Sequence, residues 1–231
     1  MKVFAISDLH LCISGAKPME IFGDGWYNYQ EKIKEDWNKK VDDDDVVLIC
    51  GDISWAMKVE EATKDFAFFD DLKGNKIFIR GNHDYWWQAI TTVRSNMPQK
   101  GFALQNDAIK HGNYVFCGTR GWLVPDDKGL SKEDEKIYKR EIIRLDMALN
   151  SAQRLKQEGD KLICMIHYPP INTNKEFNEM VELLKKYGVD ACVFGHIHSH
   201  MGKYKIHENL FGIDFYLTSC DLLKNNLLQI F

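Results

Sequence analysis

The chain of 231 residues has no apolar run long enough to cross a membrane, no closely paired cysteines and no excess of basic residues. A transmembrane helix needs about 20 mostly apolar residues in succession. The opening segment, MKVFAISDLH, has too short an apolar stretch for a secretory signal. We therefore expect no membrane partner and a cytoplasmic location.

The six cysteines are scattered, and none forms a C-x-x-C pair. They are Cys12, Cys50, Cys117, Cys164, Cys192 and Cys220. The four between positions 50 and 192 fall inside or at the end of apolar runs, where a free thiol packs as a small hydrophobic group. This usage is typical of a reducing compartment.

The charge balance is slightly acidic, with 30 basic and 34 acidic side chains and a net charge of -4. Surfaces that bind nucleic acid usually have a basic excess. Nucleic acid is therefore not the expected partner, although a local basic groove stays open. The chain also has no evident linker, repeat or low-complexity segment. We expect a single domain over residues 1–231, and the sequence does not indicate an oligomeric state.

Short apolar runs alternate with segments of helical periodicity. The runs cover residues 3–6, 46–50, 76–79, 114–117, 162–166 and 191–194, and they predict strands. Apolar residues recur with helical spacing over 29–37, 59–72 and 138–155. This alternation predicts an α/β protein with a largely parallel sheet. Short strands expected around 102–117, 203–206, 214–218 and 227–231 predict a second, more antiparallel sheet packed on the first.

Five of the apolar runs stop at a residue that can bind a metal. They end in AISDLH, LICGD, IFIRGNHD, CMIHYPP and CVFGHIH. The polar residues at these ends are Asp8, His10, Asp52, Asn82, His83, His167, His196 and His198. Open α/β sheets build their sites beyond the carboxyl ends of the strands. We therefore predict one metal centre assembled from distant parts of the chain.

The donor types indicate which ions would bind. No cysteine belongs to the set, which excludes a structural zinc site of the cysteine type. Carboxylate, amide oxygen and imidazole together suit divalent manganese, iron or zinc. Seven ligands are too many for one such ion and fit two. Two-metal sites are suited to the displacement at phosphorus in phosphoester hydrolysis.

Glycines at positions 51, 81 and 195 each precede one of these ligands, and would let the chain turn away from the strand. For each motif alone, an ordinary Gly-Asp or Gly-Asn turn explains the pattern as well as a metal site does. The five strand ends together favour the metal site.

These motifs resemble, in order, the motif set of the calcineurin-like metallophosphoesterases, a superfamily that includes bacterial-type phosphohydrolases. The matching segments are Asp8-Leu-His10, Gly51-Asp52, Gly81-Asn82-His83-Asp84, His167 and Gly195-His196-Ile197-His198. The resemblance implies a four-layer α/β/β/α sandwich. It also implies that Asp8, His10 and His198 hold one ion, that Asn82, His167 and His196 hold the other, and that Asp52 bridges them.

The resemblance implies hydrolysis by a hydroxide that bridges the two ions, with His83 and Asp84 as the catalytic pair. An imidazole titrates near neutral pH, so His83 is the residue of the set best suited to protonate the leaving oxygen. Asp84 follows His83 directly and need not contact it. We expect Asp84 to orient a neighbouring ligand, as carboxylates behind metal sites commonly do.

Three weaker candidates could contact the substrate. Arg120 is suited to grip phosphate, although a salt bridge explains a loop arginine equally well. Trp86 could stack on an aromatic group of the substrate, whereas packing in the core of a helix that begins there is the more common arrangement. His200 is a candidate because it is close in sequence to the ligands.

The predicted function is a metal-dependent phosphohydrolase that cleaves a small phosphoester, a phosphodiester or a nucleotide. After Gly51-Asp52 the chain continues as Ile-Ser-Trp-Ala-Met, without the Asp-Arg-Gly segment of the protein Ser/Thr phosphatases, which argues against that activity. The alternatives are a nuclease of the same fold and a small-molecule phosphomonoesterase. A non-catalytic binding scaffold is the least favoured, because every position of the site is present.

Overall fold

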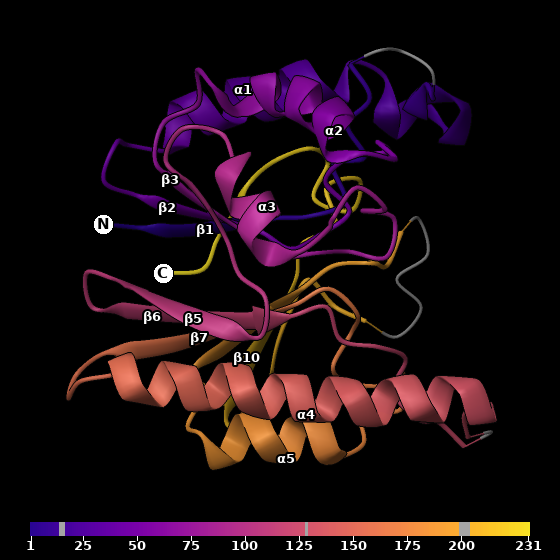
Figure 1. Ribbon diagram of the computed structural model, residues 1–231, viewed down its shortest axis with the longest axis vertical. Helices are drawn as coiled ribbons and strands as arrows, with labels where there is room; N and C mark the ends of the chain where they lie inside the picture. The colour runs from indigo at the N-terminus through magenta and orange to yellow at the C-terminus, as the bar shows by residue number, and fades with distance from the viewer. Residues whose placement is uncertain (14–16, 128, 199–203) are drawn as a thin grey trace.

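The computed structural model describes residues 1–13, 17–127, 129–198 and 204–231. Two stacked sheets lie between two layers of helices (Figure 1). The first sheet has the order β11 (Leu228–Gln229), β1 (Val3–Ile6), β2 (Val46–Ile49), β3 (Asn75–Phe78) and β4 (Gly101–Ala103). The second has the order β5 (Asp107–His111), β6 (Tyr114–Thr119), β7 (Lys161–Ile166), β8 (Ala191–Phe194), β10 (Ile213–Leu217) and β9 (His207–Leu210). The four-layer α/β/β/α architecture is confirmed.

Both sheets are mainly parallel, and antiparallel pairing occurs at their edges. In the first sheet β1, β2, β3 and β4 pair in parallel, while β11 joins β1 in the antiparallel sense. In the second, β6, β7, β8 and β10 pair in parallel, and the antiparallel partners are β5 and β9. The prediction of one parallel sheet and one more antiparallel sheet is wrong, because the strands of the C-terminal tail divide between the two.

The helices cover the two outer faces. Helices α1 (Tyr29–Lys40) and α2 (Val59–Asp65) lie over the first sheet, and α4 (Lys132–Leu155) and α5 (Glu179–Lys186) lie over the second (Figure 1). The helix predicted over 59–72 is only α2 followed by a 3₁₀ turn at Phe66–Phe69. The segment after Asn82-His83-Asp84 forms turns, and α3 (Ile90–Ser95) begins later than expected. In the described part of the chain, no helix is long and apolar enough to cross a membrane.

The core consists of three apolar layers, and alternate residues of a strand belong to different layers. In β1, Phe4 and Ile6 pack towards the α1 side, whereas Val3 and Ala5 pack between the sheets. The third layer lies between the second sheet and helices α4 and α5. With both faces covered, strands β1, β2 and β8 are continuously apolar, as expected of buried parallel strands. Four cysteines predicted to pack in this core, Cys50, Cys117, Cys164 and Cys192, are buried.

Strand direction determines where the polar strand ends meet. The chain termini lie side by side at the edge where β1 begins, because the Val3 amide donates to the Phe231 carbonyl (Figure 1). The residues that follow β1, β2 and β3 therefore leave the first sheet at the opposite edge. The residues that follow β7 and β8 lie together, since the Gly195 amide donates to the His167 carbonyl. They also lie beside the residues that follow β1, since the His196 amide donates to the Asp8 carboxylate.

Candidate metal centre

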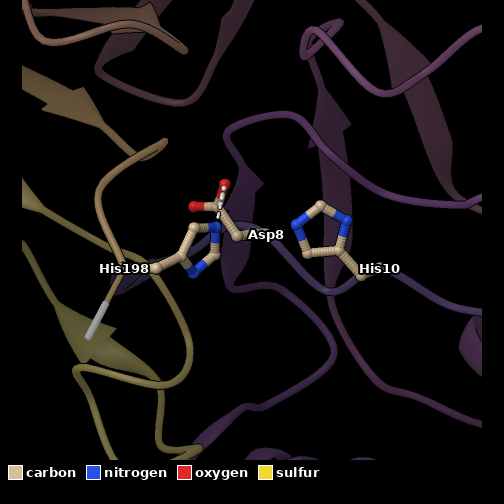
Figure 2. A group of neighbouring side chains, drawn as sticks. All are labelled: Asp8, His10 and His198. Atoms are coloured by element: carbon tan, nitrogen blue, oxygen red, sulfur yellow. Dashed lines mark ion pairs between the residues drawn. The ribbon is translucent and has the colours of Figure 1, made fainter. Parts of the chain in front are cut away.

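The ligands predicted for the first ion lie together in the structure. The ligand atoms of Asp8, His10 and His198 lie within 4.8 Å of one another. His198 Nε2 lies 3.5 Å from Asp8 Oδ1, and Figure 2 shows the His198 ring against the carboxylate, with His10 on the other side of Asp8. Asp8 and His10 are buried, and the His198 side chain is 33% exposed. This group thus opens to solvent on the His198 side.

The ligands predicted for the second ion converge on the amide oxygen of Asn82. Asn82 Oδ1 lies 2.8 Å from His167 Nε2 and 2.9 Å from His196 Nδ1. The other nitrogen of His167, Nδ1, donates to the Cys50 carbonyl at 2.9 Å, which directs Nε2 towards the centre. A hydrogen bond of this kind on the outer nitrogen is what normally orients a ligating histidine.

Asp52 lies between the two groups. Its Oδ1 accepts a hydrogen bond from the His83 amide at 2.7 Å. Its Oδ2 lies 3.8 Å from His10 Nε2 and 3.5 Å from His167 Nε2, one histidine of each predicted ion. Asp8 is also close to both groups, but its Oδ2 accepts hydrogen bonds from the Ser7 and Ser219 hydroxyls at 2.5 and 2.8 Å. Oδ2 of Asp52 is therefore the better placed oxygen for a bridge.

Four predicted ligands adopt a backbone conformation that is unfavourable for their residue type. The φ angles are 59° at Asp8, 46° at His10, 51° at Asp52 and 71° at His196. Non-glycine residues in this left-handed region cost about 1–3 kcal/mol each, and such residues cluster at functional sites. The conformation turns each ligand out of its strand direction and into the space between the sheets.

All three glycines that precede ligands are required by close approach. A Cβ atom would lie under 3.0 Å from the Asp52 side chain at Gly81, from the Asp8 side chain at Gly195 and from the His167 side chain at Gly51. The expected role in turning the chain applies to Gly51, whose φ is +91°. Each of these close approaches places the glycine before one ligand against the side chain of another.

The electrostatics of the centre favour divalent cations. Burial opposes ionisation of Asp8, but contact with His198 and the other imidazoles outweighs it and lowers the pKa of Asp8. Burial lowers the pKa values of His10 and His196 to about 4. Burial also favours a lower pKa for His167, but the negative charge of Asp52 outweighs burial and raises the pKa of His167 to about 9. A bound metal must displace that proton, so metal affinity should fall as the pH falls.

The donor set therefore fits divalent metal ions. It combines ionised carboxylates, one amide oxygen and imidazoles at the junction of the two sheets, the ligand types that these ions bind. Buried carboxylates are costly unless they are paired or bind a metal.

Asp84 acts on the backbone that carries the ligands. Its carboxylate accepts hydrogen bonds from the amides of Gly81, Asp52 and Ile53 at 2.7, 2.9 and 2.8 Å, and from Trp86 Nε1 at 3.0 Å. It is completely buried, and burial together with the charge of Asp52 raises its pKa to about 6. Asp84 thus holds the turns after β2 and β3 together and has no exposed surface.

A first cavity of about 260 Å³ opens beside the ligands of the first ion. His10, His83, His198 and Asp221 line one part of it, and Met19, Phe22, Trp26 and Trp55 line the rest. The His83 ring lies 4.7 Å from the Trp55 ring, centroid to centroid. His83 is therefore next to the predicted ligands and faces a mainly apolar space.

A second cavity of about 190 Å³ opens beside the ligands of the second ion. His196 lines it together with Tyr168, Ile171, Asn172 and Tyr204. The Tyr168 and His196 rings are 4.2 Å apart. The two cavities thus each contact a ligand of a different predicted ion.

The weaker predictions of substrate contact have different outcomes. Trp86 has no exposed surface and packs in the core against Phe66, so the prediction that it contacts substrate is wrong. Arg120 lines neither cavity at the centre: its guanidinium lies 3.8 Å from Glu141 and over the Trp122 ring. Its role as a phosphate contact stays a prediction. His200 lies outside the described residues.

Three positioning residues were not found by sequence reasoning. Ser7 and Ser219 donate to Asp8, and Asp221 Oδ1 lies 3.1 Å from His198 Nδ1. Ser219 and Asp221 follow strand β10, and the segment FYLTSCD over residues 215–221 is a further apolar run with a polar end. The rule that predicted the metal ligands could therefore have found these two residues as well.

The chain is similar in sequence and in structure to known proteins. The model of the calcineurin-like phosphoesterase family matches residues 1–200. An uncharacterized protein of Methanocaldococcus jannaschii is 28% identical over 125 residues, which cover 49% of this chain and 69% of that protein. A structure of a protein of unknown function from Aquifex aeolicus aligns with a TM-score of 0.52 at 12% identity, over 99% of this chain and 95% of that one. An archaeal phosphodiesterase aligns with a TM-score of 0.47 at 13% identity, over 100% and 99%.

Replacing Asp221 by alanine should weaken manganese binding by about 10- to 100-fold, the usual effect of removing a partner that orients a ligating histidine. The matched control is Asp214→Ala, which removes a similar contact of 2.9 Å with His207 at the other end of β10. Competition with a chelator measures both affinities. If the two variants bind manganese equally well, Asp221 does not support the centre.

Proposed function

The chain belongs to the calcineurin-like phosphoesterase family, and from that premise we propose that it hydrolyses small phosphodiesters or nucleotides with two divalent metal ions. The observation that carries the proposal is the pair of cavities at the centre, one beside each group of ligands. A diester has two substituents on phosphorus, and each would occupy one cavity. We propose that residues 1–231 act as one domain in this reaction.

The proposed ligands divide as the family resemblance implies. Asp8, His10 and His198 would hold one ion, Asn82, His167 and His196 the other, and Asp52 would bridge them. When bound, the two ions would supply charge neutralisation for the phosphoryl oxygens and a water molecule that is deprotonated near neutral pH. The chain holds the ligands in place through Asp84 and the hydroxyls on Asp8.

His83 is the proposed general acid. The His83 amide donates a hydrogen bond to Asp52, and the His83 ring lines the first cavity. Its Nδ1 is buried and has no hydrogen-bond partner among the described residues. A ring in this position could donate a proton to an oxygen that departs into the first cavity, which assigns that cavity to the leaving group. The second cavity would then hold the substituent that stays on phosphorus.

The lining of the cavities favours a diester over a monoester. Among the described residues that line the two cavities there is no lysine or arginine. A dianionic monoester would gain more than a monoanionic diester from such a cationic group. Large apolar side chains line both cavities, as is usual where a protein binds an organic substituent. They are Met19, Phe22, Trp26 and Trp55 in the first cavity, and Tyr168, Ile171 and Tyr204 in the second. A nuclease remains the second candidate, with single-stranded nucleic acid as its test substrate.

The metal stoichiometry tests the two-ion proposal. Protein reloaded with manganese should contain close to two ions per chain by elemental analysis. Asp52→Asn should lower the occupancy of both, because a bridging ligand contacts both ions. Glu61→Gln, an exposed change away from the centre, should leave two. Activity should be abolished by a chelator and restored by manganese, and full activity in exhaustively metal-free protein would contradict the proposal.

The role of His83 can be tested with leaving groups of different basicity. His83→Ala should retain the metal ions and lose about 10²–10⁴-fold in rate on a diester with a nucleoside alkoxide leaving group. The loss should be much smaller for 4-nitrophenolate, which leaves without a proton. Tyr85→Phe, which changes a neighbouring ring, serves as the control. Equal losses on both substrates would show that His83 does not protonate the leaving oxygen.

Substrate class is tested by comparing bis(4-nitrophenyl) phosphate with 4-nitrophenyl phosphate. We expect the diester to be hydrolysed at least as well as the monoester. Phe22→Ala should reduce kcat/KM for the diester, since losing a stacked ring costs about 1–3 kcal/mol. Phe22 is 64% exposed, so its removal should not unfold the protein, and Phe177, 50% exposed and outside both cavities, provides the matched control Phe177→Ala. A strong preference for the monoester, unchanged in both variants, would favour a phosphomonoesterase.

A further inference from the structure

Three arginines surround a small cavity that shares no residue with the two cavities at the metal centre. The cavity has a volume of about 100 Å³, and it is lined by Arg80, Arg120 and Arg144 together with Glu141, Thr119 and Asn106. Arg80 follows β3 of the first sheet, Arg120 follows β6 of the second sheet, and Arg144 projects from helix α4. Three distant segments of the chain therefore bring guanidinium groups to one place.

The positive charge of this cavity exceeds its negative charge. Glu141 is the acidic residue among the lining residues, and it is completely buried. Its oxygens accept hydrogen bonds from Arg144 Nη1 at 2.6 Å, from the Thr119 hydroxyl at 2.8 Å and from the Gly121 amide at 3.1 Å. One carboxylate is thus satisfied, and it can neutralise only one of the three cations.

Two of the guanidinium groups also have donors without a partner. Nε of Arg80 and Nε of Arg120 are buried and make no hydrogen bond within the described residues. Leaving a buried donor unpaired is unfavourable, and more so when the donor is charged. The three guanidinium groups also line the same cavity of about 100 Å³. The three cations are therefore close enough to repel one another.

We propose that this cavity binds a small tetrahedral anion, a phosphate that is either free in solution or part of a larger molecule. Arginine presents a planar set of donors that matches phosphate oxygens. An anion here would pair the two unpartnered Nε donors and offset the repulsion. The Thr119 hydroxyl and the Asn106 amide, which contact each other at 3.0 Å, add neutral polar groups to the same wall.

The cavity adjoins the backbone that carries two metal ligands. Arg80 precedes Gly81 and Asn82 in the chain, and the Arg120 carbonyl accepts hydrogen bonds from the amides of His167 and Tyr168 at 3.0 and 3.1 Å. This placement allows the anion to be a second phosphate group of a substrate bound at the centre. That source rests on the proposed function, whereas binding of free phosphate does not.

The first experiment counts phosphate sites by equilibrium dialysis of the manganese-loaded protein against labelled inorganic phosphate. Arg144→Gln should bind one phosphate per chain fewer than wild type, or bind it at least 10-fold more weakly. The matched control is Arg140→Gln, one helical turn away on α4 and exposed, which should bind as wild type does. Equal phosphate binding by Arg144→Gln and wild type would overturn the proposal.

A second variant guards against loss of the Glu141 contact. Arg144 forms a salt bridge with Glu141, so Arg144→Gln could alter α4. Arg80→Met instead removes a guanidinium that makes no ion pair within the described residues. It should also lose the site. If Arg80→Met keeps wild-type binding while its melting temperature is unchanged, the arginines form a structural cluster and not an anion site.

The source of the phosphate is resolved with two 4-nitrophenyl diesters that differ only by a second phosphate group. If the substrate supplies the anion, Arg144→Gln should raise KM about 10-fold for the diester with the second phosphate and leave the simple diester unchanged. If Arg144→Gln changes KM equally for both diesters while dialysis still shows one phosphate site lost, the ligand is free phosphate. Failure of all hydrolysis would count against the proposed function, and the dialysis result would stand apart from it.

Discussion

The structure around the centre depends on keeping three carboxylates in the interior without leaving them unsatisfied. Asp8, Asp52 and Asp84 are buried where the two sheets meet, and an unpaired buried charge is very costly. Asp84 accepts hydrogen bonds from backbone amides in the turns after β2 and β3. Asp8 accepts hydrogen bonds from two hydroxyls and from the His196 amide. Oδ2 of Asp52 lies 3.8 Å from His10 Nε2 and 3.5 Å from His167 Nε2. Neutralisation of that oxygen is therefore left to protonated histidine or to a metal.

The same arrangement explains why the ligand backbones can remain in unfavourable conformations. Left-handed φ angles at Asp8, Asp52 and His196 follow directly after strands whose residues are buried on both faces. The apolar layers on both sides of each sheet fix the strand ends. The hydrogen bonds to Asp84 fix the turn that follows β2. Local strain at the ligands is thus offset by packing and hydrogen bonds elsewhere, as is usual at functional sites.

Sequence reasoning succeeded where the signal is local. The strands that precede Asp8 and His196 were predicted with their observed bounds, 3–6 and 191–194, because continuous apolar runs identify buried parallel strands. It failed where the information is non-local. Nothing near residues 207–217 or 228–229 indicates which sheet those strands join, and nothing near Trp86 indicates that it faces the core. The wall residues Met19, Phe22 and Trp26 come from 3₁₀ turns, which have no apolar periodicity to detect.

The site therefore divides into two parts that the chain encodes differently. Ligand positions follow from strand ends, which are constrained by the core, so a change there disturbs both the sheets and the donor set. The cavity walls come from irregular segments such as 19–26 and 168–173, which connect the strands and contribute less to the core. Connecting segments tolerate substitution better than the elements they join. In the proposed reaction, these segments select the substituents on phosphorus, and changes in them leave the proposed metal ligands unaltered.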